Sequence, residues 1–272
     1  MTVTDLSQQR GVFSSRYGPW AVIAGASEGL GAAFARALAA DGLNLLLVAR
    51  RPQLLDELKA SLTHQHQVEV RTAPADLGSL DGVRQVTEAA TGLEVGLFVY
   101  NAAWSPIGRF VEQSVDDNLR AIDVNVRAPT ALAHHFAQPM ARRGRGGIIL
   151  LSSLTAFQGS PFVATYGATK AYNLALGEAL WFELKDQGVD VLAACPGVTR
   201  TPGLLKASPQ GGPGMLEPEQ VAREALAALG RRPINVPGVF NRTVSFVLRH
   251  FMPRSATVSL MGSQTKKLLV RR

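Results

Sequence analysis

WAVIAGASEGLGAAF, residues 20–34, is the stretch that determines the fold. Its first six residues form an apolar run typical of a buried strand, and apolar residues at helical spacing follow over 32–42. Such a glycine-rich passage lets the backbone approach a pyrophosphate, whose charge is stabilised by the helix N-terminus. The spacing is G-x-x-x-G-x-G, and a plain tight turn is the alternative reading. The predicted dinucleotide cradle is Gly25, Ser27, Glu28, Gly29, Leu30 and Gly31.

The same alternation of strand and helix continues along the chain. Further apolar runs occupy 43–49, 68–73, 95–100, 147–152 and 189–195. Helical patterns occupy 32–42, 52–62, 114–143 and 163–187, and Asp41-Gly42 and Gln187-Gly188 supply glycines that can end two helices. Continuous apolar strands are expected when helices cover both faces of a parallel sheet. The pattern predicts an α/β fold with a doubly wound parallel sheet.

Composition limits the kind of protein further. With 46% hydrophobic residues the chain can bury a large core, and we divide it into an arm (1–16), one domain (17–237) and an extension (238–272). The single cysteine, Cys195, excludes an intramolecular disulfide, and no Cys/His spacing predicts a metal site. The first residues do not resemble a secretory signal, so we expect a cytoplasmic protein.

The net charge of +7 favours acidic partners. The basic clusters are scattered and lack interleaved aromatic residues, so nucleic-acid binding is not expected.

The end of the second apolar run bears on which dinucleotide binds. It reads Val48-Ala49-Arg50-Arg51, without the acid that would bind adenosine ribose hydroxyls. Two guanidinium groups suit a 2′-phosphate, which favours NADP(H). Exposed surface arginines are the alternative, and the charge of Glu28 nearby is an objection.

A second group of residues has the chemistry of proton transfer. Tyr166 and Lys170 are one helical turn apart, so the cation is expected to lower the phenol's pKa toward the working range. Tyr166 could then exchange a proton with a ketone or alcohol oxygen. Ser153, 13 positions earlier at a strand end, could hold that oxygen, with Ser152 as the competing choice.

Together these motifs resemble the short-chain dehydrogenase/reductase family over about residues 17–237. The likeness also includes Asp76-Leu77, Asn101-Ala102-Ala103, Asn125 and Pro196-Gly197-Val198-Thr199-Arg200-Thr201. The opening Tyr17-Gly18-Pro19-Trp20 and the basic apolar tail resemble the branch near 3-oxoacyl-CoA reductases and 17β-hydroxysteroid dehydrogenases.

The resemblance implies a Rossmann-like fold with a doubly wound, seven-stranded parallel sheet, and a set of roles. Tyr166 is the implied general acid/base, Ser153 the partner of the carbonyl oxygen, Lys170 the ribose binder, and Asn125 the anchor of a relay water. Implied cofactor contacts come from Asp76 and Leu77 near the adenine, from Asn101 and Ala102, and from Pro196, Gly197, Val198, Thr199 and Thr201. Four residues depart from the family pattern: Ala24, Tyr100, Ala103 and Thr169.

The implied activity is NADP(H)-dependent hydride transfer between the nicotinamide and a ketone or secondary alcohol. An alternative is a regulatory or scaffold protein that binds NADP(H) without catalysis. The substrate pocket is expected from 104–110, 154–162 and 200–216, whose apolar content, including Trp104 and Phe157, favours an apolar small molecule. The Gly/Pro-rich loop 207–214 could act as a lid.

The extension beyond Pro237 reads as two short basic amphipathic helices separated near Pro253. Packing on the body or on a second subunit is the preferred interpretation, and peripheral membrane contact the lesser one. The family resemblance implies a homodimer or homotetramer assembled through the helices expected at 114–143 and 163–187.

Overall fold

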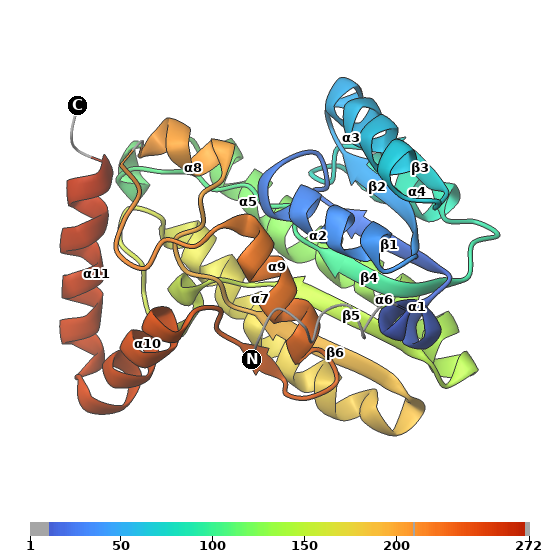
Figure 1. Ribbon diagram of the computed structural model, residues 1–272. Helices are drawn as coiled ribbons and strands as arrows, with labels where there is room; N and C mark the ends of the chain where they lie inside the picture. Colours follow the sequence, from blue (N-terminus) through green and yellow to red (C-terminus); the bar gives the residue numbers. More distant parts are fainter. Residues whose placement is uncertain (1–10, 209, 270–272) are drawn as a thin grey trace.

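A seven-stranded parallel sheet forms the centre of the molecule in the computed structural model, which describes residues 11–208 and 210–269 (Figure 1). The strand order is β3-β2-β1-β4-β5-β6-β7, so the doubly wound fold is confirmed. Residues 1–10 of the predicted arm, Pro209 of the predicted loop, and Arg271 and Arg272 of the tail lie outside the described residues. The strands are β1 Trp20–Ala24, β2 Asn44–Ala49, β3 Val70–Pro74, β4 Val95–Tyr100, β5 Gly146–Leu151, β6 Val189–Ala194 and β7 Ile234–Asn235.

Helices cover both faces of the sheet, as the unbroken apolar strands predict. One face packs on α2 (Gly29–Ala40), α3 (Pro52–Gln65) and α9 (Pro218–Ala228). The other packs on α4 (Leu80–Ala89), α6 (Ala128–Arg143) and α7 (Ala164–Glu183). Gly42 and Gly188 have φ of 89° and 71°, the left-handed conformation expected where helices end.

Several element boundaries differ from the sequence expectations. The single helix expected over 114–143 divides into α5 (Val115–Ile122), a π-helical segment Asp123–Arg127, and α6. The segment widens because it holds Asn125 against a neighbouring loop, a tertiary contact that spacing alone does not reveal. The periodicity also gave no prediction for α1 (Val12–Tyr17), α4 or α8 (Pro202–Ala207).

The C-terminal extension forms two helices, as predicted, with the break at Pro253. They are α10 (Val239–Phe251) and α11 (Arg254–Leu269), and both lie at the end of the molecule farthest from β3 (Figure 1). α11 lies against the loop that follows β5: Val258 is next to Gly159, and Gly262 next to Pro161. Among the described residues, no helix combines the length and apolar character needed to span a bilayer.

Candidate active site and dinucleotide cleft

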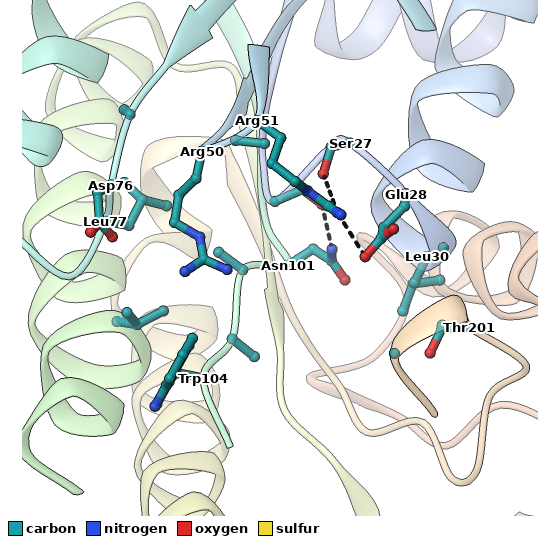
Figure 2. A pocket seen from close by; sticks show the side chains of 18 of the residues that line it. Ser27, Glu28, Leu30, Arg50, Arg51, Asp76, Leu77, Asn101, Trp104 and Thr201 are labelled. Atoms are coloured by element: carbon teal, nitrogen blue, oxygen red, sulfur yellow. Dashed lines mark hydrogen bonds and ion pairs between the residues drawn. The ribbon is translucent and has the colours of Figure 1, made fainter. Parts of the chain in front are cut away.

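A cleft of about 300 Å³ opens at the carboxyl ends of β1, β2 and β4 (Figure 2). β1 and β4 are neighbours at the centre of the sheet, and from them the strand order proceeds in opposite directions toward the two edges. Such a switch point is the usual ligand position in doubly wound folds. It is lined by twelve of the residues predicted from the sequence to bind a dinucleotide: Gly25, Ser27, Glu28, Gly29, Leu30, Arg50, Arg51, Asp76, Leu77, Asn101, Ala102 and Thr201.

The glycine turn has no room for side chains. A Cβ on Gly31 would lie 2.0 Å from the carbonyl oxygen of Gly25, and Gly25 itself has φ of 83°. Asn101 donates from Nδ2 to that same Gly25 oxygen at 2.8 Å, which fixes the turn beside β4. α2 begins at Gly29, earlier than expected, and no side chain caps its N-terminus. The turn therefore presents backbone and a helix end to the cleft, which fits a pyrophosphate.

Arg50 and Arg51 have different surroundings. Arg51 forms an ion pair with Glu28 at 2.8 Å, so the carboxylate that seemed an objection is neutralised within the cleft wall. Arg50 forms no ion pair with a carboxylate in the described part of the chain, and its guanidinium stacks on Trp104 at 5.4 Å (Figure 2). Arg50 is thus the guanidinium best placed to receive a phosphate.

Two residues of this cleft were not predicted in their observed places. Trp104 was expected in the substrate pocket, but it lies in the dinucleotide cleft, where the guanidinium groups of Arg50 and Arg120 both contact its ring. Arg120 also forms an ion pair with Asp76, in which Nη2 donates to both carboxylate oxygens, at 2.9 and 2.8 Å. Burial acts to raise the pKa of Asp76, but hydrogen bonds from Arg120 and the Gly78 N–H outweigh it and hold that pKa below its usual range. No local pattern indicates this pair, because 44 residues separate its members.

Tyr166, Lys170 and Ser153 come together beside the carboxyl end of β5. Lys170 is buried, donates from Nζ to the Leu151 carbonyl at 2.7 Å, and lies 5.5 Å from the centroid of the Tyr166 ring. Ser153 is within hydrogen-bonding reach of the Tyr166 phenol. Ser152 instead donates to the backbone oxygen of Lys170 at 2.7 Å, so its hydroxyl is occupied by the fold. The geometry favours Ser153 over Ser152 as the partner of the phenol.

The expected acidity of Tyr166 was wrong in sign. Burial raises the pKa of the phenol, and the hydrogen bond to Ser153 only partly lowers it. Burial also lowers the pKa of Lys170 from 10.5 to about 8, which weakens the cation that was expected to stabilise a phenolate. Desolvation therefore outweighs the attraction between the two groups. The phenol is protonated at neutral pH.

Asn125 lies at the centre of the π-helical segment, and both the oxygen and the nitrogen of its side chain form hydrogen bonds. It accepts from the Trp104 N–H and donates to the Trp104 carbonyl, both at 2.8 Å, and donates to Thr169 Oγ1 at 3.0 Å. Tyr100, one of the departures from the family pattern, donates from its hydroxyl to the Val124 carbonyl in the same segment. The segment thus connects the loop after β4 to α7, next to Tyr166.

The predicted contacts Pro196, Gly197, Val198 and Thr199 do not line the cleft. The loop Pro196–Thr199 follows β6, and Pro196 accepts from the Leu154 N–H at 3.0 Å, which joins that loop to the turn carrying Ser153. Thr201 caps α8 through its hydroxyl. Burial raises the pKa of the Cys195 thiol to about 12, which accords with a buried apolar role. The described residues contain no group of His, Cys, Asp and Glu suited to a metal ion.

Comparison with known proteins shows which protein family the chain resembles. The model of the short chain dehydrogenase family matches residues 19–210. A 7beta-hydroxysteroid dehydrogenase from Clostridium sardiniense is 32% identical over 233 residues, covering 85% of this chain and 89% of the relative.

Two solved structures are also similar. One, reported for the stereoselectivity of a 7beta-hydroxysteroid dehydrogenase, has a TM-score of 0.87 at 32% identity and covers 92% of this chain and 99% of its own. A short-chain dehydrogenase from Sphingobium yanoikuyae in complex with NADPH has a TM-score of 0.78 at 30% identity, covering 90% and 95%. The chain belongs to the short chain dehydrogenase family.

Proposed function

We propose that this NADP(H)-dependent oxidoreductase transfers hydride between the nicotinamide and a bulky apolar ketone or its secondary alcohol. The observation that supports this most is the cluster of Tyr166, Ser153 and Lys170 beside a cleft that contains a free guanidinium, Arg50. A protein that only holds the cofactor has no need of a phenol with a hydroxyl partner.

The residues of the cleft fit NADP(H). The glycine turn and the start of α2 suit the pyrophosphate, and Arg50 suits the 2′-phosphate. We assign Asp76 and Leu77 to the adenine side, Asn101 and Ala102 to the middle of the cleft, and Pro196–Thr199 and Thr201 to the nicotinamide side. When bound, the nicotinamide supplies or accepts the hydride.

The protein supplies the proton and holds the carbonyl. Ser153 donates a hydrogen bond to the substrate oxygen, and Tyr166 transfers its proton to that oxygen as negative charge develops there. Because burial raises the pKa of Tyr166, the phenol enters the reaction in the protonated form that ketone reduction needs. Asn125 fixes the loop that carries Trp104, and the Lys170 ammonium group lies next to the Tyr166 ring. We infer that near neutral pH the phenol is in the form that can act as the acid in ketone reduction.

An apolar substrate suits the walls near Ser153. Phe157 follows the Ser153 turn, and Pro161, on the same loop, packs on α11. The similar 7beta-hydroxysteroid dehydrogenases act, by their name, on a steroid hydroxyl. We propose a steroid or a comparably bulky ring ketone.

Initial rates test the proposal. NADPH oxidation is compared with NADH oxidation across steroid, aromatic and aliphatic ketones, and we expect turnover with NADPH that is fastest on the steroids. Absence of turnover with every ketone, despite NADPH binding, would instead support a non-catalytic role. A preference for NADH would remove the role assigned to Arg50.

We also propose a cytoplasmic homodimer or homotetramer. A groove of about 520 Å³ runs between α6 and α7 and is lined by small and apolar residues that include Ala133, Ala137, Leu176 and Leu180. The two helices are those through which the family resemblance implies assembly.

A further inference from the structure

α10 has its apolar side turned outward. Its buried residues are polar, Asn241 and Ser245, which are 4% and 7% exposed. Its large apolar residues are exposed, with Phe246 at 54% and Phe251 at 73%. The exposed apolar set is Val239, Phe240, Val244, Phe246, Val247 and Phe251. A surface helix of a globular protein shows the opposite arrangement.

Helical geometry makes this set a continuous surface. At 100° per residue, its six members fall within an arc of about 160° on one side of the helix. Asn241 anchors the other side by donating from Nδ2 to the Gly214 carbonyl at 3.0 Å. The orientation is thus fixed by packing and hydrogen bonding to the body. An exposed apolar patch of this kind marks a surface that contacts another apolar medium.

The sequence segment that contains α10 carries charges of one sign. From Ala225 to the C-terminus the sequence contains no Asp or Glu. The same stretch carries nine basic residues: Arg231, Arg232, Arg242, Arg249, Arg254, Lys266, Lys267, Arg271 and Arg272. Arg242 is paired with Glu224 at 3.7 Å, whereas Arg249 and Arg254 are exposed and form no ion pair within the described residues.

We propose that the outer face of α10, with the basic residues around it, docks on an anionic lipid surface. A symmetric contact with α10 of a second copy would cover the apolar face, but it would bring arginines together in a segment without carboxylates. Anionic headgroups satisfy those charges while the phenylalanines enter the boundary between headgroups and acyl chains.

The position of α10 connects the proposed docking to the proposed substrate site. Arg249 stacks on Phe157 at 4.1 Å, and Phe157 follows the turn that carries Ser153. α10 and α11 form one end of the molecule (Figure 1). Lipid contact at α10 therefore brings the proposed substrate site close to a phase in which apolar ketones dissolve. This consequence rests on the proposed function, whereas the docking does not.

Vesicle sedimentation of the full chain with NADPH tests the docking. Phosphatidylcholine vesicles are compared with vesicles that also contain phosphatidylglycerol. We expect binding to the anionic vesicles only, decreasing as salt rises. The double variant Phe246→Ser/Phe251→Ser should bind about tenfold or more weakly, because it removes two aromatic side chains from the contact. Arg254→Gln should also weaken binding.

The controls make the same chemical changes elsewhere. Phe182→Ser alters an equally exposed phenylalanine on α7, and Lys59→Gln removes an exposed charge on α3; both should bind like the wild type. NADPH turnover in solution, which none of these changes should alter, reports an intact fold. Failure of the wild type to sediment with anionic vesicles overturns the docking, as does undiminished binding of the double phenylalanine variant. A drop in oligomer mass of that variant without vesicle binding by the wild type assigns the face to a second copy instead.

Discussion

Lys170 is a buried cation whose ammonium group donates a hydrogen bond to the Leu151 carbonyl. Burial of an ammonium group disfavours its charged form, which is why its pKa lies at about 8 rather than 10.5. Near neutral pH the buried charge of Lys170 therefore lowers the free energy of unfolding. A residue that served stability alone would not have this effect.

We predict that this cost shows in the pH dependence of stability. Between pH 8 and 9 the folded chain loses the Lys170 proton while the unfolded chain keeps it, so stability rises with pH by about 1 kcal/mol from this group. Above pH 9, Cys195 opposes the rise, since its pKa in the fold is raised from 9.0 to about 12. Urea unfolding of the wild type and Lys170→Met checks this. An identical pH slope in both proteins would show that Lys170 is not deprotonated there.

Substitutions of the adjacent residues Arg50 and Arg51 test which guanidinium group determines the preference for NADPH over NADH. Arg50→Gln should raise the KM for NADPH by about 10- to 100-fold and leave the KM for NADH nearly unchanged, because it removes a charge-assisted contact to the 2′-phosphate. Arg51→Gln should have a smaller effect, since Arg51 is already paired with Glu28. Equal effects of both changes on NADPH and NADH would contradict the assignment.

At this scale, sequence reasoning works where residues are close along the chain. The spacing of Tyr166 and Lys170 places them on one face of α7, and the glycines of 25–31 require the turn that is observed. It does not reveal the contacts of the Trp104 ring with Arg50 and Arg120, which bring together three separate segments. Nor does it give the sign of the Tyr166 pKa shift, which depends on burial.

Among the elements, the π-helical segment Asp123–Arg127 does most to connect the two halves of the site. Its Asn125 clamps both backbone groups of Trp104, and its Val124 carbonyl is held by the Tyr100 hydroxyl. One short segment therefore joins the dinucleotide cleft to the helix that carries Tyr166.

We predict that Tyr100→Phe lowers the free energy of unfolding by about 1–3 kcal/mol, because it leaves the buried Val124 carbonyl without its partner. kcat should fall and the KM for NADPH should rise, since the change loosens Val124, which lines the cleft, and Asn125, which holds Trp104 there. Tyr172→Phe is the control: its hydroxyl bonds Thr130 at the surface, and removing it should cost less than about 0.5 kcal/mol. Urea unfolding and steady-state rates measure both. Similar losses in the two variants would argue against the role of Tyr100.

Two features that the sequence did not predict depend on tertiary contacts. The interruption of 114–143 comes from a contact with the loop after β4, and β7 consists of only two residues paired to the end of β6. Neither leaves a periodic trace in the sequence. By contrast, long buried strands and α10 and α11, divided at Pro253, are visible because their patterns are local.

At the scale of the whole molecule, the groove between α6 and α7 predicts how copies associate. Leu180→Glu places a carboxylate in that groove, so the assembled protein should dissociate to monomers in light scattering. Leu80→Glu, on the exposed surface of α4, should keep the wild-type mass. An unchanged mass of the Leu180 variant would place the interface elsewhere.

The account depends most on proton transfer by Tyr166 next to the bound cofactor. The direct measurement is single-turnover NADPH oxidation by Tyr166→Phe with a ketone that the wild type reduces, together with the Kd for NADPH. We predict that NADPH binding changes less than about threefold while the rate falls at least about 100-fold, since the phenylalanine keeps the shape and loses the proton. A variant that binds NADPH and reduces the ketone at the wild-type rate would contradict the account.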